Sequence, residues 1–309
     1  MKVLVTGAAG FSGQRMMEVL SHQGGITPVG FIRQETPETI QNPVVFKNAD
    51  LLEKDRLNTV ISEISPDAVL HLAGLTHGTQ EALHATNVKG TDNLLEAVLA
   101  ANPGCRILVI SSSAVYGYAG ESPISETAPI RPVSEYGRSK AEQETISLHY
   151  AGEGAAVAIA RPFNLAGPGQ TDAFICGRIV NQIVEIERGE RESLELWEIS
   201  SSRDLIDVRD AVRGYWALVS HEEYSQKCSG ESFNLGSGNA YRISTIINTI
   251  EKITGEHYPI RLPETPPDIA IPTQQSNNSR ITTLTGWKPV IPLADTLRDM
   301  LEAARKKKG

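Results

Sequence analysis

The chain has 309 residues, enough for one large or two modest domains, and a formal net charge of -8. The acidic balance argues against nucleic-acid binding as the main activity, and no apolar run approaches the ~18 residues that span a bilayer. Cys105, Cys176 and Cys228 are scattered without a metal-binding spacing and leave an odd thiol, which fits a reducing compartment. We expect a soluble cytoplasmic protein with buried thiols, no metal ion and no membrane contact.

The first predicted element is a short β-branched strand, residues 2–6, followed by Gly7-Ala8-Ala9-Gly10-Phe11-Ser12-Gly13 and an amphipathic stretch. Gly7 permits a tight turn, Gly10 admits a pyrophosphate to the backbone, and Gly13 lets the helix pack on the strand. The spacing G-x-x-G-x-x-G differs from the general fingerprint, so the prediction rests on the flanking strand and helix. The expected cofactor contacts are Gly7, Gly10, Phe11, Ser12 and Gly13.

The second predicted strand, residues 27–32, ends at Arg33, where a parallel sheet brings the adenosine ribose within reach. An acidic residue at that position selects NAD by bonding the ribose 2′-hydroxyl, whereas an arginine pairs with a 2′-phosphate. Arg33 therefore favours NADP(H) over NAD(H), although a solvated loop arginine has the same signature.

A third strand is predicted at Val44 to Phe46, followed by a helix from about Glu53 to Ile64. Between them, Asp50 can accept a hydrogen bond from the adenine amino group or cap the helix, and both interpretations stay open. A buried fourth strand spans Asp67 to Leu72. The residues expected to line the cofactor here are Leu51, Leu72, Ala73 and Gly74.

Two polar residues stand out near this fourth strand. His71 has no second ligand at metal spacing, so we expect a packed histidine. Asn87 lies in a long predicted helix, from about Gln80 to Ala100, where it either locks the backbone near the cofactor or makes a local hydrogen bond.

A fifth strand at Arg106 to Ile110, a helix from Ser134 to about Tyr150 and a sixth strand at Ala155 to Ala160 complete the first half. Alternation of strands and helices from residue 1 to 161 predicts an α/β fold, a Rossmann-type doubly wound parallel sheet. Such a sheet binds its ligand at the carboxyl ends of the strands.

The candidate catalytic groups follow the fifth strand. Ser112 comes directly after it, and Tyr136 and Lys140 lie four residues apart on one face of the next helix. A nearby ammonium lowers the pKa of a phenol from about 10, which makes a usable acid or base. Tyr-x-x-x-Lys also occurs by chance on surface helices, so the prediction depends on the sheet edge that gathers these residues.

In these features the chain resembles the extended short-chain dehydrogenase/reductase family of nucleotide-sugar enzymes. The matching segments are 7–13, 50–51, 71–74, 111–117, 136–140, 161–164, 167–170, 203–204, 207–210 and 285–289. The resemblance implies that Ser112, Tyr136 and Lys140 form the catalytic triad. It also implies that Asn164 faces the sugar or its phosphates and that Arg203 clamps the diphosphate, a role that suits an arginine fork.

The resemblance divides the chain into a Rossmann domain, residues 1–170, and a smaller α/β domain, residues 171–309, which mainly binds the nucleotide sugar and returns segments to the large sheet. Further expected cofactor contacts are Asn87, Tyr136, Lys140 and Pro162, and further expected substrate contacts are Ser112, Ser113, Arg178, Arg209 and Arg280. At least two of the four arginines are expected to have ordinary surface roles. The resemblance also implies a homodimer, formed through the helices near residues 80–100 and 134–150.

The residues after Ser112 bear on the reaction. In the 4,6-dehydratases of the family these positions carry carboxylates, but here they are Ser113 and Ala114, and alanine cannot move a proton. A 4-epimerase and a 4-keto reductase remain. Segments 167–187 and 200–210 look most like reductases that act on GDP-4-keto-6-deoxy-mannose, whereas 112–117 looks as much like an epimerase.

Arg33 favours the reductase, because a net reductase consumes a reduced cofactor that is usually NADPH. The sequence thus predicts NADPH-dependent reduction of the C4 ketone of a nucleoside-diphosphate 4-keto-6-deoxyhexose. An NAD-dependent 4-epimerase is the alternative, and a cofactor-sensing regulator or scaffold is the alternative outside enzymes.

Overall fold

A seven-stranded, wholly parallel sheet forms the centre of the computed structural model, which describes residues 1–33, 45–265 and 271–307. In spatial order its strands are β10 (Ser232–Leu235), β6 (Val157–Pro162), β5 (Arg106–Ile110), β4 (Ala68–His71), β1 (Lys2–Thr6), β2 (Thr27–Ile32) and β3 (Val45–Asn48). The order reverses between β1 and β4, which opens a crevice at the carboxyl edge. The predicted Rossmann sheet is confirmed; Val44, its expected third-strand start, lies outside the described residues.

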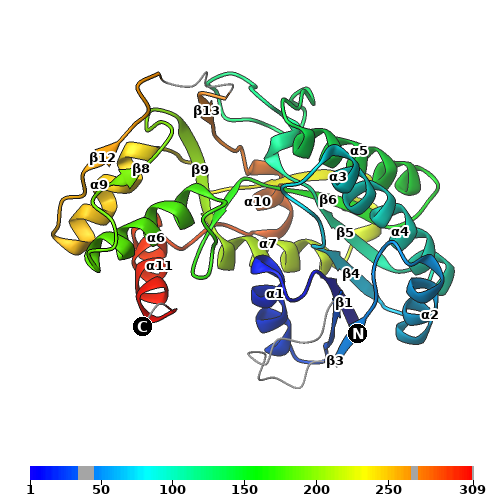
Figure 1. Ribbon diagram of the computed structural model, residues 1–309. Helices are drawn as coiled ribbons and strands as arrows, with labels where there is room; N and C mark the ends of the chain where they lie inside the picture. Colours follow the sequence, from blue (N-terminus) through cyan, green and yellow to red (C-terminus); the bar gives the residue numbers. More distant parts are fainter. Residues whose placement is uncertain (34–44, 266–270, 308–309) are drawn as a thin grey trace.

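Helices cover both faces of this sheet (Figure 1). α1 (Phe11–Ser21) and α7 (Val208–Val219) pack on one face, while α2 (Lys54–Ile64), α4 (Gly90–Ala101) and α5 (Glu135–Gly152) pack on the other. Burial on both faces explains why the strands read as continuous apolar runs rather than alternating ones.

The long helix expected near residues 80–100 is interrupted. It consists of α3 (Gln80–His84), a π-helical turn η1 (Ala85–Lys89) and α4. The wider turn carries Asn87, whose side chain bonds both backbone atoms of Leu75, twelve residues earlier. Single π-helical turns within helices are frequent at functional sites.

A second, smaller unit lies to one side of the large sheet (Figure 1). Its helices α6 (Ile175–Glu187), α9 (Ile243–Thr254) and α11 (Leu293–Lys307) share one apolar cluster. Its strands are β7 (Asn164–Ala166), β8 (Leu194–Glu195), β9 (Ser202–Asp207), β11 (Ala240–Arg242), β12 (Ile260–Arg261) and β13 (Thr273–Gln274). α7, β10 and α10 (Ser279–Thr285) instead pack with the large sheet, so parts of the second half return to it.

The three cysteines are buried and free. Within the described ranges, no helix is long and apolar enough to cross a membrane. The same part of the chain contains no group of three or more His, Cys, Asp or Glu residues that could hold a metal ion.

Candidate active site

The turn between β1 and α1 has no room for a side chain at Gly7, nor does the first turn of α1 at Gly13. Gly7 has a φ of +66°, and a Cβ added to it would lie 2.9 Å from the Ala73 backbone. A Cβ on Gly13 would lie 2.1 Å from the Gly7 carbonyl oxygen. Gly10 caps α1 without a side-chain hydrogen bond. The first turn of α1 therefore has no side-chain cap on its backbone N–H groups, which is the arrangement that accepts a pyrophosphate.

A cavity of about 550 Å³ opens at this turn, along the carboxyl edge of the sheet. The loops that leave β1, β4, β5 and β6 form one side, and the smaller unit forms the other. The predicted residues that line it are Gly7, Gly10, Phe11, Ser12, Gly13, Leu72, Gly74, Ser112, Ser113, Tyr136, Pro162, Asn164 and Arg203. The fold thus gathers segments from residue 7 to residue 203 around one space.

Ser112 and Tyr136 meet in this cavity. Ser112 follows β5 and caps a short 3₁₀ turn, η2 (Ser113–Val115), by accepting a hydrogen bond from the Ala114 N–H at 3.1 Å. Tyr136 lies in the first turn of α5 and forms a hydrogen bond with Ser112. Burial raises the pKa of Tyr136 above its ordinary value, and the hydrogen bond with Ser112 opposes that rise. The expectation of a lowered pKa is wrong for this arrangement.

Lys140 does not donate a hydrogen bond to Tyr136 in the described structure, because its ammonium is bonded to other acceptors. Its Nζ donates to the carbonyl oxygen of Ile110 and to Oε1 of Gln143, both at 2.8 Å. Burial lowers the pKa of Lys140 to about 8, with Glu144 opposing. Those two bonds use two of the three ammonium donors. Nζ also lies 3.4 Å from where a Cβ of Gly74 would stand, so it is close behind the cavity wall.

Arg203, on β9, brings positive charge to the cavity. Its Nη1 donates to the Ser202 carbonyl at 2.9 Å, and no carboxylate of the described residues lies within ion-pair distance. Burial lowers the pKa of Arg203, and Glu198 opposes that shift. On the same side, Asn164 Nδ2 lies 3.4 Å from the Asp204 carbonyl. The described lining contains no aspartate or glutamate.

Ser113 is held by a residue that the sequence analysis did not identify. Its Oγ donates to Gln274 Oε1 at 3.0 Å, and Gln274 Nε2 donates back to the Ser113 carbonyl at 3.0 Å. The Ser113 hydroxyl is therefore bonded to the protein, although the residue lines the cavity. Gln274 belongs to β13, which pairs with β9 so that Gln274 is opposite Arg203.

Other predicted cofactor residues lie outside the lining. Arg33 is exposed directly after β2. Asp50 Oδ1 accepts from the Leu52 N–H at 3.0 Å, so it braces the turn, and Glu53 occupies the cap of α2. Leu51 is buried against the position of Gly90.

Ala73 and Asn87 hold the loop that follows β4. Ala73 N–H donates to Thr6 Oγ1 at 3.1 Å. Asn87 is fully buried, and besides its two bonds to Leu75 it donates to Ser139 Oγ at 3.0 Å. Asn87 therefore locks the backbone of this loop and ties it to α5, which is the first of the two interpretations of this residue.

Three arginines expected to bind the substrate have other partners. Arg178 donates to the Asp172 carbonyl, Arg280 pairs with Glu231, and Arg209 pairs with Asp207 and Asp299. None of the three lines the cavity that holds Tyr136. Of the four predicted substrate arginines, only Arg203 does.

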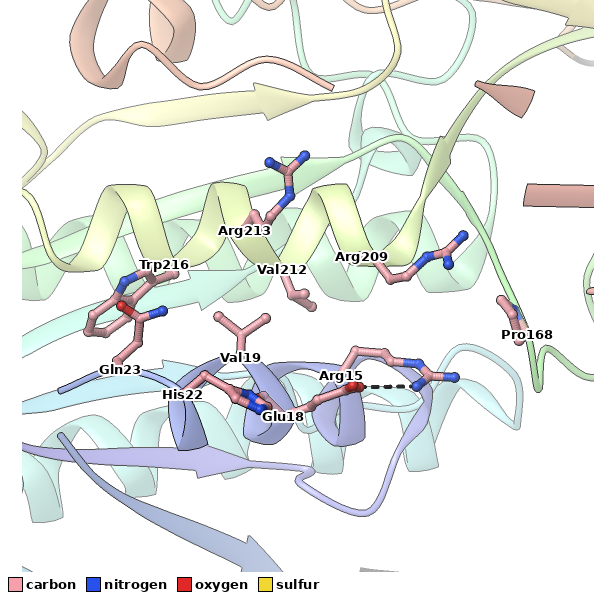
Figure 2. A pocket seen from close by; sticks show the side chains of 10 residues that line it. All are labelled: Arg15, Glu18, Val19, His22, Gln23, Pro168, Arg209, Val212, Arg213 and Trp216. Carbon is pink, nitrogen blue, oxygen red and sulfur yellow. Dashed lines mark hydrogen bonds and ion pairs between the residues drawn. The ribbon is translucent and has the colours of Figure 1, made fainter. Parts of the chain in front are cut away.

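Arg209 instead lines a larger cavity, of about 630 Å³, between α1 and α7 (Figure 2). Arg15 and Arg213 also line it, and they pair with Glu18 and Asp210. Its arginine charges are thus balanced by acids, and Ser112, Tyr136 and Lys140 are absent from its lining. It is not the candidate active site.

The lining of the candidate active site includes further residues that the sequence analysis did not assign to it. Among them are Thr76, His77, Phe174, Ile271 and Gln274. The rings of His77 and Phe174 meet edge to face with 5.8 Å between centroids. This contact joins the loop after β4 to the segment before α6, and only the folded chain brings the two together.

Similarity to known proteins agrees with this geometry. Residues 3–236 match the NAD dependent epimerase/dehydratase family. A GDP-6-deoxy-D-mannose reductase of Pseudomonas aeruginosa is 33% identical, covering 97% of this chain and 96% of the relative.

Two solved structures are similar over nearly the whole length. RMD from Pseudomonas aeruginosa complexed with NADPH has a TM-score of 0.86 and 31% identity, covering 99% of both chains. UDP-glucuronic acid 4-epimerase from Bacillus cereus, in complex with UDP-glucuronic acid and NAD, has a TM-score of 0.88 and 26% identity, covering 99% of this chain and 100% of that one. The chain belongs to the NAD-dependent epimerase/dehydratase family and is a nicotinamide-dependent enzyme of the nucleotide-sugar epimerase and reductase type.

Proposed function

We propose that this protein uses NADPH to reduce the C4 ketone of a nucleoside-diphosphate 4-keto-6-deoxyhexose. The proposed substrate is GDP-4-keto-6-deoxy-D-mannose, and the product is a GDP-6-deoxyhexose of the rhamnose or talose type. The observation that carries the proposal is the chemistry of the cavity: its described lining combines the hydroxyls of Ser112 and Tyr136 with Arg203 and no carboxylate. This set supports proton transfer to a ketone, whereas elimination of water needs a carboxylate.

Arg203 supports a diphosphate as the group that anchors the substrate. A guanidinium fork matches two phosphate oxygens, and a partly desolvated one binds them more strongly than an exposed one. Asn164 adds an amide on the same side of the cavity. The similarity to a GDP-6-deoxy-D-mannose reductase supports guanosine as the base.

The glycine turn fits a nicotinamide dinucleotide, because Gly7 and Gly13, where a Cβ would clash with the Ala73 backbone and the Gly7 carbonyl oxygen, keep the turn tight before the helix N-terminus that would accept the pyrophosphate. Ser111 Oγ is buried without a hydrogen-bond partner in the described structure and belongs to the same lining, so it offers that ligand a further polar atom. Arg33 at the end of β2 supports a 2′-phosphate and hence NADPH. When bound, the reduced nicotinamide supplies a hydride.

Tyr136 acts as the general acid in this proposal. Hydride at C4 and a proton on the former carbonyl oxygen together convert the ketone to an alcohol, and the phenol supplies that proton. Its raised pKa keeps Tyr136 protonated at neutral pH, as a proton donor must be. Ser112 donates a hydrogen bond to the same oxygen, and the Lys140 charge stabilises the phenolate that remains. The third donor of Lys140 is proposed to hold the nicotinamide ribose.

The test follows NADPH consumption with GDP-4-keto-6-deoxy-D-mannose and with its dTDP counterpart. The expected result is one NADPH consumed per alcohol formed, with a higher kcat/KM for the GDP sugar. Interconversion of 4-hydroxy epimers without net NADPH use would instead identify a 4-epimerase, the alternative favoured by similarity to the UDP-glucuronic acid enzyme.

We also infer a homodimer formed through α3, α4 and α5, which lie side by side (Figure 1). His84 on α3 pairs with Glu142 on α5, and Tyr150 on α5 bonds Asp92 on α4 at 2.8 Å, so the helices form one surface. Sedimentation velocity would test this inference, and a monomer at micromolar concentration would contradict it.

A further inference from the structure

Lys140 is one end of a buried hydrogen-bond chain that crosses four elements. Its Nζ donates to Gln143 Oε1 at 2.8 Å, and Gln143 Nε2 donates to Thr91 Oγ1 at 2.7 Å. Thr91 Oγ1 lies 2.8 Å from His71 Nε2, and His71 Nδ1 lies 2.7 Å from Thr6 Oγ1. The chain thus runs from α5 through α4 and β4 to β1, immediately before the glycine turn.

Every link of this chain is shielded from water. Gln143, Thr91, His71 and Thr6 are 0% exposed, and Lys140 is 5% exposed. A buried polar network whose members are all bonded holds its side chains in one arrangement, since any other arrangement leaves a buried group unpaired. The position of the Lys140 ammonium is therefore coupled to residues that do not reach the cavity.

The donor and acceptor properties of Lys140 and Thr91 fix the direction of the hydrogen bonds between them and to His71. An ammonium only donates, so Gln143 must present its oxygen to Lys140 and its NH₂ to Thr91. The Thr91 hydroxyl proton goes to the Asn87 carbonyl at 2.7 Å, which leaves Thr91 Oγ1 to accept from both Gln143 and His71. We accordingly assign His71 the neutral Nε2–H tautomer.

The far end of the chain is consistent with that assignment. Thr6 Oγ1 accepts the Ala73 N–H, so its proton is available to His71 Nδ1. Burial, together with the charge of Lys140, lowers the pKa of His71 to about 3, which keeps the ring neutral. No donor faces a donor anywhere along the chain.

We propose that Gln143 is a positioning residue for Lys140, and that Thr91 and His71 fix Gln143 relative to the glycine turn. With Gln143 and the Ile110 carbonyl holding two N–H groups, the third remains available to a ligand in the cavity. The inference rests on the proposed function to the extent that Lys140 acts in it.

Gln143 differs in kind from the titratable groups near the ammonium, which are Glu144 and Tyr136 on α5 and His71 on β4. As a neutral amide it offers an acceptor without adding a charge. Removing it should disfavour the charged form of Lys140, because hydrogen bonding to a charged form stabilises that form.

The test compares Gln143→Leu, which removes both bonds, with Thr91→Val, which removes the hydroxyl, and Thr91→Ser, which retains it. Steady-state kinetics give kcat and KM for the 4-keto sugar. NMR of protein carrying lysine labelled with ¹³C at Cε gives the Lys140 titration without any turnover, and Lys140→Met assigns its signal.

In Gln143→Leu we expect kcat to fall about 10- to 100-fold with KM for the sugar within about 2-fold, and the Lys140 titration to move about one pH unit lower. Thr91→Val should also lower kcat and move the Lys140 titration to lower pH. Thr91→Ser should keep the wild-type kcat and the wild-type Lys140 titration. If Gln143→Leu does not fold, the comparison of Thr91→Val with Thr91→Ser tests the proposal.

Unchanged kcat and an unchanged titration in Gln143→Leu and Thr91→Val would overturn the proposal. So would a fall in kcat that follows the folded fraction alone while the titration stays in place, because that pattern indicates a purely structural role. A wild-type protein that consumes no NADPH would contradict the proposed function, yet the Lys140 titration would still read out the inference, so the two failures are distinguishable.

Discussion

Glu144 on α5 and Arg161 on β6 form a buried ion pair through two parallel hydrogen bonds, Oε1 to Nε at 2.8 Å and Oε2 to Nη2 at 2.6 Å. Their side chains are 5% and 6% exposed. Arg161 also donates to the Tyr116 hydroxyl at 2.8 Å and lies 5.0 Å from the centre of its ring. The pair ties the helix that carries Tyr136 and Lys140 to the central sheet.

Glu144→Ala should lower the free energy of unfolding by about 3–5 kcal/mol, because it leaves the Arg161 charge buried without its partner. Urea denaturation measures the change. Glu223→Ala is the control, since its ion pair with Lys227 is exposed to solvent and should contribute far less to stability. A loss in Glu144→Ala as small as that of the control would contradict the role assigned to the pair.

Tyr136→Phe should lower kcat about 10²- to 10⁴-fold, the range typical of a lost general acid, while the Kd for NADPH stays within about 2-fold. Stopped-time product analysis and fluorescence titration measure the two quantities. Tyr118→Phe, at an exposed tyrosine, should leave both unchanged. Near-normal turnover of Tyr136→Phe would show that the Tyr136 phenol is not the general acid.

Arg203→Ala should raise KM for the nucleotide sugar about 10- to 100-fold, in keeping with the loss of charge-assisted hydrogen bonds of about 1.5–3 kcal/mol. KM for NADPH should change much less. Arg178→Ala is the matched control, because that guanidinium bonds the Asp172 carbonyl outside the cavity. Equal effects of the two substitutions would show that Arg203 is not the diphosphate anchor.

Arg33→Glu should lower the ratio of kcat/KM for NADPH to that for NADH about 10- to 100-fold, since a carboxylate repels a 2′-phosphate and accepts from a 2′-hydroxyl. Initial rates with each cofactor measure the ratio. The same change at Arg56, an exposed arginine on α2, should leave it unaltered. An unaltered ratio in Arg33→Glu would show that residues other than Arg33 determine the preference between NADPH and NADH.

The kcat/KM for NADPH should fall as the pH rises through about 8, because this parameter reports ionisations of the free enzyme and Lys140 loses its proton there. Tyr136, whose pKa is raised, stays protonated in that window. The folded-state pKa of Lys140 lies below the ordinary 10.5, so the unfolded chain binds more protons between about 8 and 10.5 and this group makes the protein more stable as pH rises there. A profile that stays flat to pH 9 would exclude Lys140 as the titrating group.

The fold of the first half of the chain could be predicted from the sequence, because the local sequence pattern and the tertiary fold agree there. The bounds predicted for β2 and β5 match the structure, since each is a short apolar run between clear breaks. The parallel-sheet rule alone predicted that Gly10, Ser112 and the segment after Ala160 lie at one edge of the sheet. The π-helical turn was not predictable, because it depends on Asn87 reaching Leu75 in another loop.

The second half shows where sequence reasoning stops. Arg203 and Arg209 are both arginines beside aspartates in one matching segment, yet one faces the cavity and the other pairs with Asp299, ninety residues away. No sequence pattern identified Gln274 as a site residue, because its position opposite Arg203 is set by the register between β13 and β9. Such assignments require the partner of each side chain, and the partner is set by tertiary structure.

β7 leaves β6 after a single residue, Phe163, and immediately pairs with β9, which carries Arg203. The wall that is proposed to recognise the sugar is therefore a direct continuation of the cofactor-binding sheet, and only Phe163 separates the two strands where the chain passes from one unit to the other. A change of substrate within such a frame requires new side chains on β9 and β13, with the backbone left as it is.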